Sequence, residues 1–114
     1  MIISIFGGTV LRPGMEGEEA RVMDLLDPIL RSMPGFISYK DYTADDSESI
    51  AIARFTTREA LDAWVHQPDH VDVQEIAHEI YDFLWVQTAE TFSEATYEKG
   101  TRVDGDLSHL FIGA

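Results

Sequence analysis

Apolar residues recur along this chain with two different periods, and the changes between these periods predict its secondary structure. Val22, Leu26, Ile29 and Met33 are three or four residues apart, which is typical of the buried face of a helix, here over residues 16–33. Short runs rich in β-branched and aromatic residues predict four strands, at residues 2–11, 36–42, 49–55 and 83–92.

Two shorter helices are predicted between the third and fourth strands. Thr56 and Glu59 have the spacing of a capping box, with Thr56 as the N-cap of the first helix. Pro68 is tolerated in the first turn of a helix but not in its interior. The chain is therefore expected to restart at this proline and to continue as a helix to about Tyr81.

The predicted order of elements is that of a ferredoxin-like α+β domain, a βαββαβ unit whose four-stranded antiparallel sheet has its helices on one face. Residues 49–55 are apolar on both faces of the sheet, so the face without helices also needs a cover. We expect a homodimer in which two sheets pack face to face. Residues 1–92 form this domain, and residues 93–114 form a C-terminal tail that packs on the partner.

The charge balance limits the partners of this chain. Its 21 acidic and 8 basic residues give a net charge of −13, which argues against nucleic acid and against an anionic membrane. The acidic residues indicate either a solubilising surface or an acidic docking face. The chain has no cysteine, which fits a cytoplasmic protein, and its apolar N-terminal run is too short to span a membrane.

Candidate chemistry is concentrated in residues 59–78, which contain three of the four histidines. At about 100° per residue, His70, Gln74 and Tyr81 fall on one edge of a buried helix face, whereas the third histidine of the stretch points to solvent. No metal site is predicted, because the helix break at Pro68 separates the first histidine from the other two.

Two interpretations are open for each of the main candidates. His70 is either a general base or a boundary side chain paired with a neighbouring aspartate or a backbone carbonyl, and its acidic surroundings are expected to raise its pKa. Trp64 is either a core aromatic or the wall of a pocket. Further polar groups expected at such a pocket are Tyr39, Lys40, Arg54 and Trp85.

Five short motifs follow one another along the chain: Arg12-Pro13-Gly14, Pro34-Gly35-Phe36, Ala60 to Trp64, Pro68-Asp69-His70 and Gln74. In order and spacing they resemble the antibiotic biosynthesis monooxygenase family of dimeric α/β barrels, over about residues 1–92. The resemblance implies a small homodimer with a pocket between helices and sheet in each subunit. Members of that family include quinone-forming monooxygenases that need no metal or flavin, and haem-degrading enzymes.

The functional residues of that family are matched in part. Trp64 is similar to the helical tryptophan of both branches. The quinone-forming branch has an Asn one turn before this tryptophan and an Arg on the last strand, whereas this chain has Ala60 and no Arg in residues 83–92. Haem degraders have an Asn on the first strand and a His about ten residues after the tryptophan, where this chain has Gln74.

Three functions follow as hypotheses. The first is a monooxygenase without cofactor that oxidises a small electron-rich aromatic or quinol with O2, with His70 and Trp64 as catalytic residues. Its substrate pocket is expected to include Gln74, Tyr81, Tyr39, Arg54 and Trp85. The second is a non-catalytic dimeric module that binds a small hydrophobic metabolite, and the third is a haem-binding or haem-degrading protein.

Overall fold

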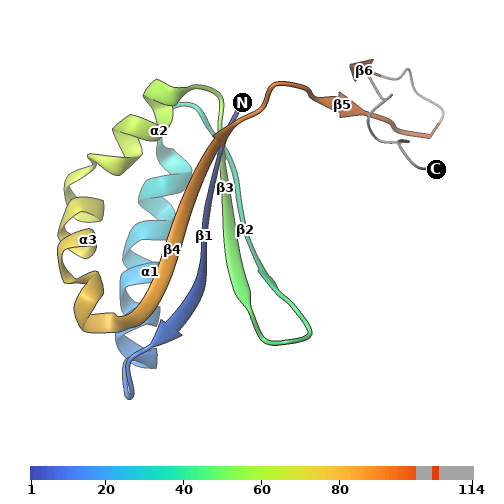
Figure 1. Ribbon diagram of the computed structural model, residues 1–114. Helices are drawn as coiled ribbons and strands as arrows, with labels where there is room; N and C mark the ends of the chain where they lie inside the picture. Colours follow the sequence, from blue (N-terminus) through green and yellow to red (C-terminus); the bar gives the residue numbers. More distant parts are fainter. Residues whose placement is uncertain (100–103, 106–114) are drawn as a thin grey trace.

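A computed structural model describes residues 1–99 and 104–105, and it has a four-stranded antiparallel sheet with three helices on one face (Figure 1). The strand order is β2-β3-β1-β4. The strands are β1 (Ile2–Leu11), β2 (Phe36–Thr43), β3 (Ser49–Phe55) and β4 (Tyr81–Glu90), and the helices are α1 (Glu16–Ser32), α2 (Arg58–Val65) and α3 (Pro68–Ile80). The predicted ferredoxin-like α+β fold is confirmed.

The core lies between the sheet and the helices, where the apolar faces of both meet. Val22, Leu26 and Leu30 form the buried stripe of α1. Phe55, at the end of β3, is fully buried and packs edge-on against Phe36 of β2. Removing these side chains from water is the main favourable contribution to folding, and it holds α1 against the sheet.

The start of α2 differs from the prediction by one residue. Thr57, and not Thr56, is the N-cap: its Oγ1 accepts the backbone N–H of Ala60 at 3.1 Å. The backbone N–H of Thr56 is already bonded to the carbonyl oxygen of Gly35, which holds this residue in the preceding turn. The restart at Pro68 is confirmed, because α3 begins at this residue.

The last core strand begins two residues earlier than predicted. The helix α3 ends at Ile80, and Tyr81 is already paired with Leu11 of β1. Tyr81 is therefore the first residue of β4 and not part of the last turn of a helix, so its position in the cavity lining does not come from helical spacing.

Two adjacent glycines make room for an indole ring on the sheet. A Cβ atom on Gly7 would lie 2.8 Å from the ring of Trp85, and Gly8 has a φ of 62°, which few residues other than glycine adopt. The register between β1 and β4 shifts between Gly7 and Val10. The first strand continues through this irregularity to Leu11, so it has the bounds predicted from the sequence.

The sheet face away from the helices has an apolar centre formed by β1 and β3. Side chains alternate along each strand, so Ile3 and Ile5 of β1 and Ile50 and Ile52 of β3 lie on this face, partly exposed. Phe83 of β4 is 56% exposed. A contiguous apolar surface of this kind marks an interaction site in most soluble proteins.

The chain leaves the domain after β4. β5 (Ala95–Thr96) pairs with β6 (Asp104–Gly105) in a small separate sheet, which Figure 1 shows apart from the domain. Residues 100–103 and 106–114 of the predicted tail lie outside the described residues. None of the helices in the described part of the chain has the length and apolar character needed to cross a membrane.

Candidate functional site

A cavity of about 960 Å³ lies between the helices and the sheet. All three helices contribute to its wall, together with side chains on the helix-facing side of the sheet. It brings together five of the eight predicted site residues: Tyr39, Trp64, His70, Gln74 and Tyr81. This cavity is therefore the candidate functional site.

Trp64 is placed by α2, whose inner face carries Ala60 and Trp64 into the core. The indole is 8% exposed. Its Nε1 has no hydrogen-bond partner among the described residues. Every fully buried side-chain nitrogen or oxygen in that part of the chain has a partner, so Nε1 is not fully buried. The indole N–H therefore keeps contact with open space, as a wall of the cavity would.

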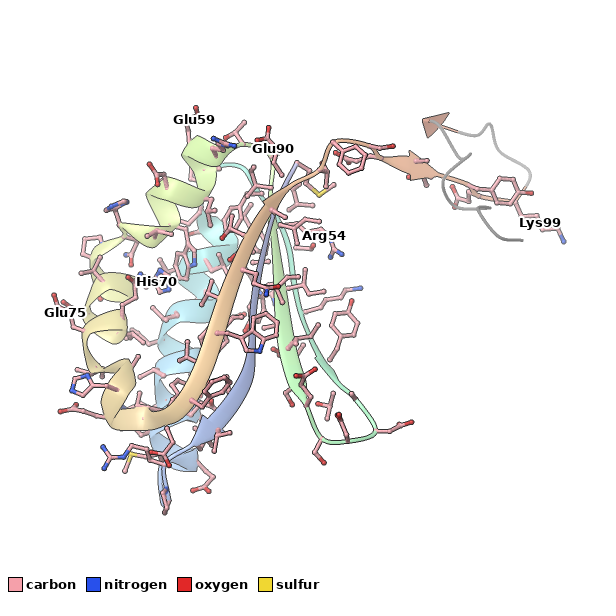
Figure 2. The ribbon with its side chains drawn as sticks, in the orientation of Figure 1. Arg54, Glu59, His70, Glu75, Glu90 and Lys99 are labelled. Atoms are coloured by element: carbon pink, nitrogen blue, oxygen red, sulfur yellow. The ribbon has the colours of Figure 1, made fainter. Side chains whose placement is uncertain are left out.

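His70 is fixed in the first turn of α3. Gln67 is the N-cap of this helix, and its Oε1 accepts the backbone N–H of His70 at 2.9 Å. The imidazole lies against the indole of Trp64, with ring centroids 4.1 Å apart and ring planes 14° apart. Figure 2 shows His70 on the side of α3 that faces the sheet. The break at Pro68 therefore folds α3 back so that the two rings stack.

The hydrogen bonds of the imidazole determine which nitrogen carries its proton. Nδ1 lies 2.9 Å from the carbonyl oxygen of Trp64, which can only accept, so Nδ1 is the protonated nitrogen of the neutral ring. The side-chain amide of Gln74 donates to the carbonyl oxygen of Val65 at 2.9 Å. The Nε2 atom of Gln74 also lies 3.1 Å from Nδ1 of His70. Because both nitrogens carry hydrogens, we interpret this distance as a contact and not as a hydrogen bond. No described residue bonds to Nε2 of His70, which remains an acceptor.

The predicted rise in the pKa of His70 is wrong. Burial lowers the pKa of this imidazole, and the bond to the Trp64 carbonyl opposes that shift only in part. The neighbouring acids do not reverse it: the carboxylate of Asp69 accepts from Gln67 at 3.2 Å, and Asp72 is exposed. A neutral imidazole with an unprotonated Nε2 is therefore the main form at neutral pH.

Tyr81 closes the part of the cavity near the start of α1. Its hydroxyl donates to Oε2 of Glu19 at 2.6 Å, and its ring packs edge-on against Phe6 with centroids 5.8 Å apart. Burial, reinforced by the carboxylate of Glu19, raises the pKa of Tyr81. The phenol therefore stays protonated, and the pair carries the single negative charge of Glu19.

Tyr39 reaches the cavity from β2. Burial raises the pKa of its phenol to about 12, and the nearby carboxylate of Asp41 acts in the same direction. A phenol with such a pKa is a donor and acceptor of hydrogen bonds at neutral pH, but not a base.

The remaining predicted pocket residues do not reach this cavity. Arg54 lies on β3 between the inward-facing Ala53 and Phe55, so it points away from the helices, as Figure 2 shows. Lys40 is paired with Ile52 on the same outer face. Trp85 covers Gly7 on that face, too. The alternation of side chains along a strand separates these three residues from the cavity.

The charges around the cavity have one sign. Its charged lining residues are Glu19, Asp24, Asp27 and Asp41, and no Lys or Arg among the described residues lines it. No three His, Asp or Glu side chains in the described part of the chain lie close enough together to hold a metal ion.

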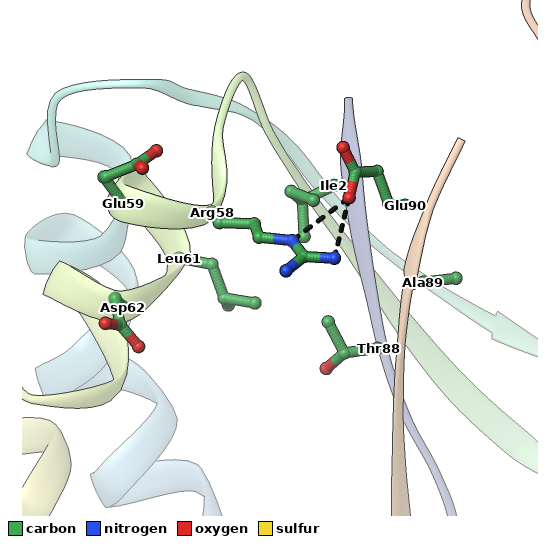
Figure 3. A pocket seen from close by; sticks show the side chains of 8 residues that line it. All are labelled: Ile2, Arg58, Glu59, Leu61, Asp62, Thr88, Ala89 and Glu90. Carbon is green, nitrogen blue, oxygen red and sulfur yellow. Dashed lines mark hydrogen bonds and ion pairs between the residues drawn. The ribbon is translucent and has the colours of Figure 1, made fainter. Parts of the chain in front are cut away.

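A second hollow, of about 340 Å³, lies between the start of α2 and the end of β4 (Figure 3). Arg58 reaches across it, with Nε 3.0 Å and Nη2 2.9 Å from Oε2 of Glu90. Both side chains are exposed, so this ion pair contributes little to stability. None of the predicted site residues lines this hollow.

Three residues of the site were missed from the sequence. Glu19 fits the general preference for acids at a helix N-terminus, and nothing in its neighbourhood points to Tyr81, which is 62 residues away. Phe6 belongs to a strand with several large apolar residues, and nothing in the sequence singles it out from the others. Gln67 could have been found, because it directly precedes Pro68, the residue that starts α3.

Comparisons with known proteins agree with this architecture. The profile of the antibiotic biosynthesis monooxygenase family matches residues 9–76, which is more than half of the chain. No curated protein sequence matches.

Solved structures with the same fold come from several bacteria. Rv0793 from Mycobacterium tuberculosis is 20% identical with a TM-score of 0.70, and the match covers 84% of this chain and 100% of that one. SO0527 from Shewanella oneidensis is 16% identical with a TM-score of 0.67 over 77% and 87% of the two chains. SnoaB, a cofactor-independent oxygenase from Streptomyces nogalater, is 14% identical with a TM-score of 0.64 over 80% and 93%. The family match over residues 9–76 shows that this chain belongs to the antibiotic biosynthesis monooxygenase family, and the solved structures show the same fold.

Proposed function

We propose that this protein is a monooxygenase that needs no cofactor and oxidises a small electron-rich aromatic or quinol with O2. The observation that carries the proposal is the arrangement of His70, a residue that lines the cavity: its Nδ1 is bonded to the Trp64 carbonyl, and no described residue bonds to its Nε2. Membership of the family and the likeness of the fold to SnoaB support the same reaction class.

The free Nε2 of His70 is a suitable general base. Burial lowers the pKa of the ring, which keeps it neutral and able to accept a proton at neutral pH. The Trp64 carbonyl holds the ring in one tautomer, and the indole of Trp64 holds its plane. This is the pairing of a base with an orienting acceptor that proton-abstracting enzymes use.

The reaction needs no external reductant, because the substrate supplies all the electrons. Nε2 removes a proton from an activated methylene group or a phenol, and the resulting anion passes an electron to O2. Superoxide and the substrate radical combine to form a C–O bond, and loss of water then breaks the O–O bond. In sum, one methylene group and one O2 give one carbonyl group and one water, which balances atoms and electrons. The indole N–H of Trp64 is a donor available to the developing oxyanion, whereas the phenol of Tyr39 interacts with the carboxylate of Asp41.

A haem-degrading activity fits this cavity poorly. Haem carries two propionates, and the lining offers four carboxylates and, within the described residues, no Lys or Arg. A binding module for a small hydrophobic metabolite is the second candidate, and it is favoured by the absence of the family's Asn and Arg at Ala60 and in residues 83–92. It predicts tight binding without O2 consumption.

The proposal includes a homodimer formed through the sheet faces. The row of isoleucines on β1 and β3 is the surface that would be covered, and a second copy of this chain supplies a matching surface. The C-terminal tail, residues 93–114, would then pack on the partner. Its first part, β5, already points away from its own domain in Figure 1.

Oxygen uptake with a panel of hydroquinones and anthrones tests the proposed reaction. We expect uptake with at least one substrate, a loss of about 10² to 10⁴ in kcat/KM for His70→Ala, and a smaller loss for Trp64→Phe. His66→Ala is the matched control, because this exposed histidine does not line the cavity. Absence of uptake with every substrate would reject the reaction, and tight binding of the same compounds would then support the binding module.

A further inference from the structure

The cavity has an uncompensated negative charge that bears on which ligands it accepts. Glu19 is in the first turn of α1, and its side chain is only partly exposed. The hydroxyl of Tyr81 donates to its Oε2 at 2.6 Å, but a neutral donor leaves the charge of the carboxylate in place. No salt bridge joins Glu19 to a cation within the described residues.

The neighbouring acids show how this differs from an ordinary surface. Asp27 also lines the cavity, but its Oδ2 is 2.9 Å from Nε of Arg31. Asp24 and Asp41 are exposed, so water and salt screen them. Among the four lining acids, Glu19 is therefore the one that is partly buried and has no ion pair with a described residue.

Hydrogen-bonding capacity points in the same direction. Neutral His70 presents an unprotonated Nε2, and Glu19 presents carboxylate lone pairs that Tyr81 does not use. Both groups accept. A ligand with O–H or N–H donors satisfies them, whereas a ligand carboxylate offers only acceptors and is also repelled.

We propose that the cavity admits uncharged or cationic aromatic ligands carrying hydroxyl or amino donors and rejects those with a carboxylate or phosphate, with Glu19 as the residue that sets this selectivity. This inference rests on the proposed function, since it names the substrate class of the same cavity. The selectivity depends on the charge of Glu19 alone, and the four lining acids are not proposed to bind an ion together.

Anaerobic isothermal titration with three matched hydroquinones tests the inference without turnover. The compounds are hydroxymethylhydroquinone, which is neutral, 2,5-dihydroxybenzoate, which is anionic, and aminomethylhydroquinone, which is cationic. We expect the anion to bind at least about tenfold more weakly than the neutral compound, and the cation to bind at least as tightly as the neutral one. The three affinities of the wild type test the selectivity by ligand charge without any variant.

Glu19→Gln assigns the effect to one side chain. We expect this variant to reduce the ratio of neutral to anionic affinity to about threefold or less. Glu16→Gln is the matched control, because it removes the same charge from the same helical turn at an exposed position outside the cavity, and it should keep the wild-type ratio.

Equal affinities for the three compounds, tighter binding of the anion, no binding of any of them, or an unchanged ratio in Glu19→Gln would overturn the inference. The expected order of affinities without O2 uptake in air would leave this inference standing and reject the oxygenase. Uptake of O2 with 2,5-dihydroxybenzoate as the preferred substrate would support the oxygenase and overturn this inference.

Discussion

At the residue scale, the chemistry of His70 depends on a backbone carbonyl that no side-chain motif reveals. The Trp64 carbonyl determines the tautomer, and burial keeps the ring neutral. Both effects come from the turn at Pro68, which brings the end of α2 against the start of α3. A mutation that moved this turn would change the base without altering the histidine itself.

The lowered pKa of His70 predicts how folding stability depends on pH. The unfolded chain takes up a proton at His70 near pH 6.5, whereas the folded chain takes it up only at lower pH. The stability that the neutral ring contributes is therefore present above about pH 6.5 and is lost as pH falls through the lowered folded-state pKa.

Urea denaturation of wild type and His70→Gln at pH 7.5 and pH 5 measures this contribution. Glutamine does not titrate, so the wild type should lose more free energy of unfolding between the two pH values than the variant does. Equal losses in both proteins would show that His70 has no lowered pKa in the folded state.

At the element scale, one hydroxyl determines where α2 begins. Thr57→Ala removes the acceptor for the backbone N–H of Ala60 and should cost about 1 kcal/mol of unfolding free energy. Thr56→Ala is the matched control and should cost less than about 0.5 kcal/mol, because its hydroxyl caps no helix. Thermal or urea unfolding of both variants measures the difference, and a larger loss for Thr56→Ala would contradict the observed cap.

The elements could be predicted from the sequence where local signals sufficed. The spacing of Val22 and Leu26 and the restart at Pro68 depend on residues close in sequence, and both predictions were confirmed. The cap could not be chosen between two adjacent threonines, since the choice depends on the bond from Thr56 to Gly35. The start of β4 was missed for a similar reason: Tyr81 pairs with Leu11, far away in the chain.

Prediction of the candidate site was more limited. Helical spacing predicted that His70 and Gln74 lie on one side of a helix. In the structure both lie on one side of α3, where His70 stacks on Trp64 of α2. Arg54 and Trp85 were grouped with them because the sequence alone does not say which face of the sheet a strand turns toward its helices. The direction of the pKa shift of His70 was missed because sequence proximity to aspartates does not show where their carboxylates point.

At the scale of the whole molecule, the apolar sheet face predicts self-association. Light scattering at micromolar concentration should give twice the mass of the chain. Ile5→Glu places a carboxylate in the middle of that face and should give the monomer mass. Its fold should persist, as far-UV circular dichroism can verify, because the side chain is partly exposed in a single chain.

Leu25→Glu is the control for this experiment. Leu25 is 41% exposed on α1, on the helical side of the domain, so this variant should keep the mass of the dimer. A wild-type protein that is monomeric, or equal behaviour of the two variants, would contradict a dimer through the sheet face.

The central claim is that neutral His70 acts as the base in an oxygen-consuming reaction, and the pH dependence of kcat/KM for O2 uptake tests it most directly. The wild type should show a rate that rises about tenfold per pH unit at low pH and levels off at an apparent pKa below 6.5. His70→Ala should lose this limb together with about 10² or more of the rate. A rate independent of pH between pH 4.5 and 8, or an unchanged profile in His70→Ala, would contradict the assignment.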